Sequence, residues 1–346
     1  MLHHSKPTIA IVNSSSFGRA FPEHLERLER FAHIIRVEIP NDAPASVFHE
    51  KLRDVDGIIA SVTPRYSREV LQGLPTLRVI CRHGVGCDNV DLDCCVELGI
   101  PVSKVGPEVE RESVAQMTMA LMHAAGRQIV SGVDTVRRGA WAERAKLPLG
   151  IDFAGSTVGL VGLGAIGSTV ARMLTHGYRA KVIAYDPYLS EQQITDRDAT
   201  KVSLDELIAT SDVISLHCPL TKETSRMLTS ETFQKVKRGV VLVNTTRGEI
   251  LDQAALISAL HSGAVGSYAT DVVEGEPINA DHELLKVPNA IITPHLGGYS
   301  TLSLRGMGLT MVEDMESVFT KGGFVGVLAN AALSRADSRV ERMRHT

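Results

Sequence analysis

The sequence predicts an α/β fold made of two doubly wound, parallel-sheet domains. Three observations support this prediction. The chain has 346 residues, a length typical of two ordinary domains. Short apolar, β-branched runs alternate with helical segments along most of it. One such run, residues 157–161, ends in the glycine-rich turn Gly162-Leu-Gly-Ala-Ile-Gly167, and a helical segment follows at 168–174.

The glycine-rich turn has the spacing of a dinucleotide-binding strand–turn–helix unit. Gly162 permits the tight turn, Gly164 lets the backbone approach a pyrophosphate, and Gly167 lets the helix pack closely on the strand. The N–H groups at the start of the helix would face the phosphates. Glycine-rich turns are common, so this spacing needs support from its context.

The next expected strand, residues 181–185, supplies that context because it ends in Asp186, 19 residues after Gly167. An acid at this place can accept hydrogen bonds from the adenosine ribose. Pro187 follows it where an Arg would favour NADP, and a carboxylate would repel a 2′-phosphate. NAD is therefore expected and NADP is less favoured. The alternative is a structural βαβ unit with a surface Asp.

Composition excludes several other classes of protein. Hydrophobic residues make up 44% and charged residues 22%, as in globular proteins, and a net charge of −4 argues against a nucleic-acid partner. No apolar run approaches the ~20 residues of a membrane span, and the first residues lack the apolar core of a signal peptide. Five cysteines without a CxxC pair indicate reduced thiols, and hence the cytoplasm. The histidines lack the spacing of metal ligands, so no metal site is expected.

The first third of the chain predicts strands at 8–12, 34–39, 57–60, 77–81 and 101–102, with a helix at 21–31. Gly84 and Gly86 follow the fourth strand and would leave backbone N–H groups available to an anion such as a carboxylate. The alternative is a plain strand-to-helix turn.

The segment that follows is expected to cross between the domains. Ser113-Val-Ala-Gln116 resembles a capping box and would open a helix at 114–125. Residues 127–152 fit no simple βα pattern, and are either an arm that packs on a second subunit or a surface loop. Beyond the turn, strands are expected at 212–217, 239–244, 266–271 and 290–295, with helices at 203–209, 253–260 and 301–319. The charged tail from residue 334 is expected to fray.

Polar residues stand at the ends of the expected strands of the second domain. In an open α/β sheet, ligands bind outside the carboxyl ends of the strands, so these residues should border one crevice. They are Gly162, Asp186, His217, Arg247, Asp271 and His295.

Arg247, Glu276 and His295 form a candidate catalytic set within this group. An Arg fork can bind a substrate carboxylate and polarise the adjacent carbonyl. A His can give a proton to a developing alkoxide or take one from an alcohol, and a neighbouring carboxylate would hold the His in place. Each residue also has a purely structural interpretation, and Glu274 competes with Glu276 for the acidic role.

Five motifs in order resemble the signatures of the D-isomer-specific 2-hydroxyacid dehydrogenases, including the phosphoglycerate dehydrogenases and hydroxypyruvate reductases. The resemblance covers about residues 8–330, and Gly84-Val-Gly-Cys-Asp-Asn-Val-Asp91 also looks like that family's substrate-domain loop. The five motifs are Gly162-Leu-Gly-Ala-Ile-Gly167, His217-Cys-Pro-Leu-Thr-Lys-Glu-Thr224, Asn244-Thr-Thr-Arg-Gly-Glu-Ile-Leu-Asp252, Asp271-Val-Val-Glu-Gly-Glu-Pro277 and Thr293-Pro-His-Leu-Gly-Gly298.

The resemblance implies a Rossmann cofactor domain, residues 105–298, inserted in a flavodoxin-like substrate domain, residues 1–104 plus 299–332. It also implies a cleft that closes on substrate, a homodimer with its arm at about 127–152, and a flexible tail at 333–346. It selects Glu276 as the catalytic acid because the family's Glu directly precedes Pro. The residues implied to bind substrate are Ser61, Gly84, Val85, Gly86, Arg247 and His295. The residues implied to bind the cofactor are Val85, Gly162, Gly164, Ala165, Ile166, Gly167, Asp186, His217, Cys218, Pro219, Thr224, Thr245, Thr246, Arg247, Asp271, His295, Gly297 and Gly298.

The chain departs from the family pattern at three places. Gln116 stands where many relatives have Glu, and an Asn that often approaches the substrate is missing near Lys104. Ala60 stands where phosphoglycerate dehydrogenases often have an Arg for the phosphate, and Arg65 is a candidate substitute. The regulatory C-terminal domain of the longer phosphoglycerate enzymes is not expected.

The predicted function is reversible hydride transfer between NAD(H) and a small 2-keto or (R)-2-hydroxy acid, such as phosphoglycerate, glycerate/hydroxypyruvate or glyoxylate. Two alternatives stay open. One is a non-catalytic, NAD-sensing scaffold like the transcriptional corepressors that resemble this family. The other is a dehydrogenase of the same fold for another small acid, such as formate or phosphite. Formate enzymes usually carry Gln at the place of Glu276, which argues against that option.

Overall fold

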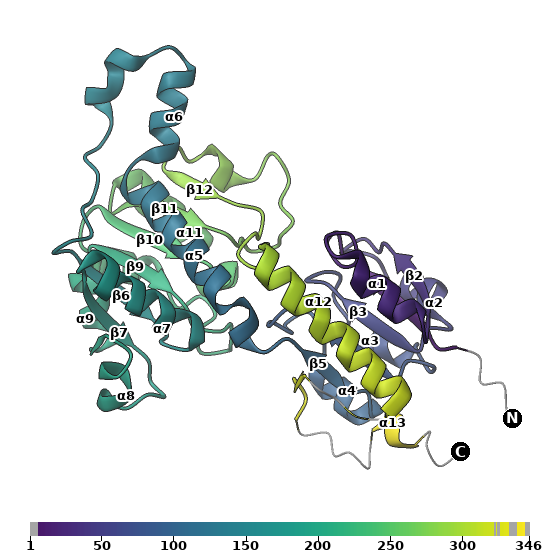
Figure 1. Ribbon diagram of the computed structural model, residues 1–346. Helices are drawn as coiled ribbons and strands as arrows, with labels where there is room; N and C mark the ends of the chain where they lie inside the picture. The colour runs from purple at the N-terminus through teal and green to yellow at the C-terminus, as the bar shows by residue number, and fades with distance from the viewer. Residues whose placement is uncertain (1–5, 322, 324–325, 332–337, 343–346) are drawn as a thin grey trace, which may run out of the picture. The chain divides into compact units, whose positions relative to one another are not determined.

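The computed structural model describes residues 6–321, 323, 326–331 and 338–342, and it divides into two compact units (Figure 1). Unit 1 comprises residues 1–110 and 300–346, and unit 2 comprises residues 111–299. The sequence predicts the junctions at 104/105 and 298/299, whereas the units divide at 110/111 and 299/300. Helix α5, Pro107–Gly126, begins in unit 1 and continues in unit 2.

Unit 1 contains a six-stranded sheet in the order β13-β5-β4-β3-β1-β2. All pairs are parallel except β13 with β5. Its central strands are fully buried, as expected for a sheet covered on both faces. The elements are β1 Thr8–Val12, α1 Pro22–Glu29, β2 His33–Val37, α2 Ala45–Leu52, β3 Gly57–Ala60, α3 Arg68–Gln72, β4 Val79–Arg82, α4 Leu92–Leu98, β5 Val102–Lys104, α12 Thr301–Glu316, the π-helical turn η5 Ser317–Lys321, β13 Val327–Leu328 and α13 Arg339–Arg342.

Unit 2 contains a seven-stranded parallel sheet in the order β12-β11-β10-β9-β6-β7-β8. The chain leaves β6 toward β7 and later returns to β9 on its other side, so the strand order reverses at β6. The elements are α6 Ile129–Arg137, η1 Trp141–Lys146, β6 Thr157–Val161, α7 Ala165–Arg172, η2 Met173–Tyr178, β7 Lys181–Tyr185, α8 Glu191–Thr195, β8 Thr200–Lys201, α9 Leu204–Thr210, β9 Val213–Leu216, α10 Ser230–Lys235, β10 Val240–Asn244, η3 Gly248–Ile250, α11 Gln253–Ser262, β11 Val265–Thr270, η4 Glu283–Lys286 and β12 Ala290–Ile292.

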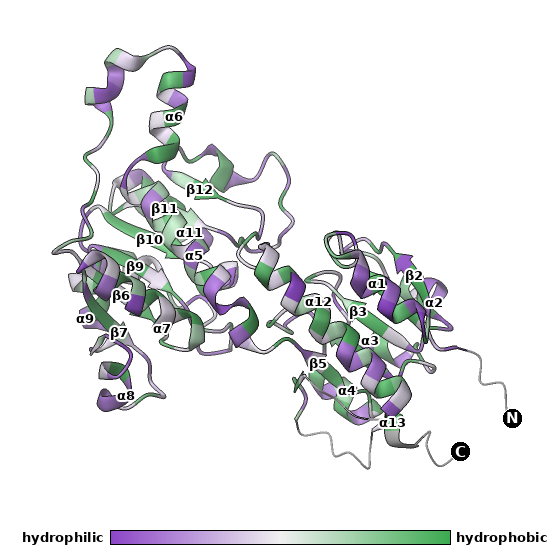
Figure 2. Cartoon of the chain, viewed as in Figure 1, coloured by the Kyte–Doolittle hydropathy of each residue, from purple (hydrophilic) through white to green (hydrophobic). Residues whose placement is uncertain are grey.

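Each sheet separates two apolar clusters, and Figure 2 shows green hydrophobic strands at the centre of both units. Val158 and Leu160 of β6 face one cluster of unit 2, and Val161 faces the other. This alternation follows from the two-residue period of a strand. The predicted class, with a doubly wound parallel sheet in each domain, is confirmed.

Two local predictions are wrong. Ser113 does not open a helix, because α5 begins at Pro107 and Ser113 lies inside it. The fixed φ of proline suits the first turn of a helix, which outweighs the capping-box pattern. Residues 338–342 do not fray: α13 packs on unit 1, where the Arg339 guanidinium donates to the carbonyls of Leu98 and Leu77 at 2.9 and 2.7 Å, and Val340 is buried. Residues 333–337 and 343–346 of the expected tail lie outside the described residues.

Candidate active site

The glycine turn of unit 2 has the geometry of a phosphate cradle. Gly162 has φ +93°, and a Cβ there would lie 2.8 Å from the backbone of His217 and Cys218. A Cβ on Gly167 would lie 2.3 Å from the Gly162 carbonyl oxygen, so the helix start must be glycine to pack on the turn. By contrast, the space around Gly164 is open. That opening leaves room for a ligand's phosphate beside the backbone.

The first N–H groups of α7 complete this cradle. The helix begins after Gly164, and the amides of Ala165 and Ile166 donate to no group in the part of the chain that the structure describes. Helix N-termini with such donors bind phosphates well. The pyrophosphate of NAD therefore fits the residues present, and these two amides would hold it.

Asp186 connects the cradle to the end of β7. Its Oδ2 accepts a hydrogen bond from the Leu163 amide at 3.0 Å, and its Oδ1 accepts one from the Tyr188 amide at 3.0 Å. Each carboxylate oxygen can accept a second bond, so the ribose contact expected at Asp186 is compatible with this geometry. The carboxylate also fixes the turn itself.

His217 and Cys218 follow β9, next to the glycine turn. Burial lowers the pKa of His217 to about 3, so its imidazole is neutral. Its Nε2 lies 3.0 Å from the Ser215 hydroxyl, and its Nδ1 is buried and has no partner among the residues that the structure describes. Burial also raises the pKa of Cys218 to about 11. Farther along this loop, the Thr224 hydroxyl donates to the Pro219 carbonyl at 2.6 Å. This bond holds the turn that contains both residues, which the family resemblance predicts to contact the cofactor.

The turn after β10 presents Arg247, and Asn244 shapes that turn. The buried Asn244 amide oxygen accepts hydrogen bonds from the Thr246 N–H at 3.0 Å and the Thr246 hydroxyl at 2.8 Å. The Asn244 amide nitrogen donates to the Arg247 carbonyl at 2.8 Å. Thr245 is held separately, because its hydroxyl lies 2.9 Å from that of the buried Thr118 on α5.

His295 and Glu276 meet at the ends of β11 and β12. His295 Nδ1 lies 2.5 Å from Glu276 Oε1, while Glu276 Oε2 accepts from the Val273 amide at 3.2 Å. Both side chains are about one-third exposed, at 31% and 29%. His295 Nε2 makes no hydrogen bond among the described residues. Glu274, the competing acid, instead pairs with Arg226 at 3.6 Å.

Asp271 holds the loop that carries His295. The carboxylate is buried, and it accepts hydrogen bonds from the Thr293 hydroxyl at 2.5 Å and the amides of Leu296 and Gly297 at 2.8 and 2.6 Å. His295 has φ +54°, a left-handed conformation that costs energy in a residue with a Cβ. These bonds, and the bond from the His295 amide to the Asp271 carbonyl at 3.0 Å, offset that cost. Gly298 follows in the same turn.

Unit 1 carries the residues expected to bind substrate on the loops after β3 and β4. The expectation of an available amide at Gly84 is wrong, because this amide donates to the Arg82 carbonyl at 2.8 Å in a tight turn. The amides of Val85 and Gly86 make no hydrogen bond with the described residues. Asn89 joins the two loops by donating to the carbonyls of Ser61 and Pro64, both at 3.0 Å.

Sequence reasoning overlooked three positioning residues, namely Asn244, Thr118 and Asn89. Asn244 and Asn89 lie inside motifs that the sequence singles out, and an Asn before a turn is a common sign of a side chain that bonds to the backbone. Nothing in the sequence marks Thr118, which is one of several polar residues in its helix.

Comparison with known proteins identifies the family. Residues 119–297 match the model of the D-isomer-specific 2-hydroxyacid dehydrogenase NAD-binding domain. The chain belongs to the D-isomer-specific 2-hydroxyacid dehydrogenases, a family of NAD-dependent oxidoreductases. The matched model is that of an NAD-binding domain, so the expectation of NAD is confirmed at the level of the family.

Individual relatives of this dehydrogenase family differ in the substrates that they are named for. A glyoxylate reductase of Korarchaeum cryptofilum is 36% identical over 80% of this chain and 83% of its own length. A D-3-phosphoglycerate dehydrogenase of Archaeoglobus fulgidus is 37% identical over 77% of this chain, which spans only about half (50%) of that longer protein. The D-lactate dehydrogenase of Aquifex aeolicus, solved with NAD and lactic acid, is 30% identical with a TM-score of 0.79, over 92% of this chain and 98% of that one.

Proposed function

We propose that the chain catalyses reversible hydride transfer between NAD(H) and a small 2-keto or (R)-2-hydroxy acid, with Arg247, Glu276 and His295 as its catalytic residues. The observation that carries the proposal is the bond between His295 Nδ1 and Glu276 Oε1, at the same sheet edge as the glycine cradle. Because this bond engages Nδ1, it directs the other ring nitrogen to the substrate. NAD(H) supplies or accepts the hydride when it is bound.

In reduction, His295 Nε2 gives its proton to the oxygen of the keto group as the hydride adds to the carbonyl carbon. In oxidation, the same nitrogen takes the proton from the hydroxyl group. Arg247 binds the substrate carboxylate through its guanidinium fork and polarises the neighbouring carbonyl. Glu276 holds the imidazole in place through its bond to Nδ1. On unit 1, the amides of Val85 and Gly86 and the loop that begins at Ser61 are the contacts proposed for the acid group of the substrate.

A panel of 2-keto acids tests this proposal, with glyoxylate, hydroxypyruvate, phosphohydroxypyruvate and pyruvate each followed by NADH absorbance. At least one acid is expected to be reduced, and His295→Ala or Arg247→Ala is expected to lower kcat/KM by at least about 100-fold. Near-wild-type turnover in either variant rejects the assignment. A protein that binds NADH but reduces no acid in the panel favours the non-catalytic scaffold.

We also propose a homodimer built on the arm at 127–152. The arm includes α6 and η1, and Figure 1 shows α6 standing away from the sheet of unit 2. Val130 and Val133 are each 42% exposed and Trp141 is 70% exposed, which is unusual for large apolar side chains unless a partner covers them. Light scattering after size exclusion should give a dimer mass, and Val133→Asp should shift it toward the monomer. A wild-type protein that is monomeric at micromolar concentration contradicts this.

We infer a cytoplasmic location from the state of the cysteines. No disulfide joins any of the five in the structure, and three of them are buried, which suits a reducing compartment. No helix in the described residues is both apolar enough and long enough to cross a bilayer. Cell fractionation with a tagged full-length chain tests the location, and recovery from a membrane or secreted fraction contradicts it.

A further inference from the structure

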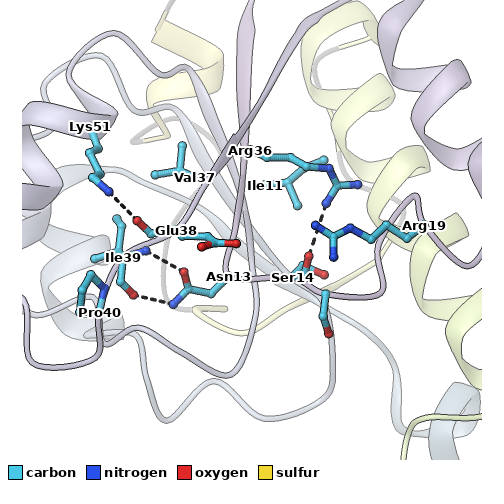
Figure 3. A pocket seen from close by; sticks show the side chains of 11 residues that line it. Ile11, Asn13, Ser14, Arg19, Arg36, Val37, Glu38, Ile39, Pro40 and Lys51 are labelled. Carbon is cyan, nitrogen blue, oxygen red and sulfur yellow. Dashed lines mark hydrogen bonds between the residues drawn. The ribbon is translucent and has the colours of Figure 1, made fainter.

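Unit 1 contains a cavity that the proposed reaction does not use. It has a volume of about 610 Å³ and lies where β1 and β2 end (Figure 3). Ligand sites for small molecules typically have volumes of about 300–1,000 Å³. Ser61 and Gly84–Gly86, the residues expected to bind substrate, are not among its lining residues.

Two guanidinium groups stand at one end of the cavity. Arg36 is fixed there by donating to the carbonyls of Phe17 and Ser14, at 2.6 and 3.4 Å. Arg19 extends toward it from the loop after β1, and Figure 3 shows the two guanidinium groups side by side. Partial burial and the positive charge of Arg19 lower the pKa of Arg36, so the two cations repel each other. Neither arginine has a carboxylate ion-pair partner within the described ranges.

The charge of the cavity favours an anion. Lys51 is a third cation, and its ammonium donates to the Glu38 carbonyl at 2.7 Å. Glu38 is the one acidic residue of the lining, and no ion pair engages its carboxylate among the described residues. Three cations therefore face one carboxylate. Two adjacent guanidinium groups that have no carboxylate partner among the described residues match the charge and the oxygens of a phosphate or carboxylate group.

The opposite wall of the cavity is rigid and partly apolar. The Asn13 side chain accepts from the Ile39 amide at 2.8 Å and donates to the Ile39 carbonyl at 2.7 Å. These two hydrogen bonds to the backbone of Ile39 fix this wall of the cavity between the ends of β1 and β2. Ile11, Val37 and Pro40 provide apolar surface for the carbon skeleton of a ligand.

We propose that this cavity is a binding site for a small organic acid, whose phosphate or carboxylate group lies between Arg19 and Arg36. The site is separate from the predicted substrate contacts, but one bond connects them. The Asn13 side chain donates to the Thr63 hydroxyl at 3.4 Å, on the loop that begins at Ser61. This bond connects the cavity wall to the substrate loop, which suits an effector.

Calorimetric titration of the full chain with inorganic phosphate, and separately with citrate, tests the proposal and distinguishes the two anion sources. Arg247→Ala serves as the background, so that the proposed active site contributes less to the signal. Arg19→Gln should weaken binding of the preferred anion by about 10-fold, the usual effect of losing one charge-assisted pair. Arg53→Gln is the matched control, because Arg53 is exposed on unit 1 outside the cavity and its guanidinium makes no hydrogen bond or ion pair with the described residues. It removes the same charge and should change binding less than twofold.

Glu38→Gln gives an independent result, since it removes the one opposing charge and should tighten binding. Equal weakening by Arg19→Gln and Arg53→Gln would show only a general charge effect and would overturn the proposal. Failure of both anions to bind the Arg247→Ala chain would overturn it as well. Neither outcome bears on hydride transfer, which the keto-acid panel tests separately.

Discussion

Replacing Glu276 with Gln tests the part of the site that the geometry defines best. The substitution keeps the shape of the side chain but removes one acceptor and the charge. In the structure, both carboxylate oxygens accept hydrogen bonds, one from His295 Nδ1 and one from the Val273 amide. A Gln has one oxygen and one NH₂ group, so it can satisfy only one of these two donors.

The magnitude follows from the bond that is lost. If the Gln oxygen accepts from His295, the NH₂ group points at the Val273 N–H, and two donors meet. If the Gln oxygen accepts from Val273, the NH₂ group points at His295 Nδ1 instead. A charge-assisted hydrogen bond contributes about 1.5–3 kcal/mol. Since both side chains are about one-third exposed, we take the lower part of that range. About 1.5–2 kcal/mol corresponds to roughly a 10- to 30-fold fall in kcat/KM.

The assay is steady-state NADH oxidation with the best acid of the panel. Glu274→Gln is the matched control: Glu274 pairs with Arg226 on the surface, does not contact His295, and should change kcat/KM by less than about twofold. A Glu276→Gln enzyme within threefold of wild type would refute the claim that this carboxylate supports the imidazole. A larger loss in the Glu274 variant would give the supporting role to Glu274.

Three further outcomes are expected. His295→Asn removes the proton donor and should lower kcat by about 100-fold or more at saturating NADH, whereas an unchanged kcat would contradict its role. Asn244→Ala removes the bond to the Arg247 carbonyl, so it should displace Arg247 and raise KM for the keto acid by about 10-fold, with KM for NADH nearly constant. Equal rises in the two KM values would indicate general destabilisation instead. Asp186→Ser should lower the ratio of kcat/KM with NADH to that with NADPH by at least about 10-fold, and a constant ratio would contradict the ribose contact.

The sequence predicted what depends on local pattern. Apolar runs located the strands, and the rule that ligands lie at carboxyl ends of strands placed residues that are far apart in the chain, such as Asp186 and His295, at the same edge of one sheet. It did less well at two other places. The amide of Gly84 turns back to Arg82 in a tight turn, and the spacing of the glycines does not show which of their amides stays available. The chain at Arg339 is fixed by carbonyls of residues more than two hundred positions earlier, and no local pattern contains that information.

The polar residues of the candidate site separate into those that face a ligand and those that shape the backbone. Asn244 and Asp271 are both buried, and their side chains are engaged with the turns that carry Arg247 and His295. Arg247 and His295 are themselves only partly buried. The division has a physical reason. A side chain that must bind a substrate cannot also use all its hydrogen-bonding groups within the protein, so the backbone turn that carries it must orient it. Substitutions of the buried pair, Asn244 and Asp271, should therefore damage catalysis by displacing the turns, and substitutions of the partly buried pair, Arg247 and His295, by removing the reacting groups.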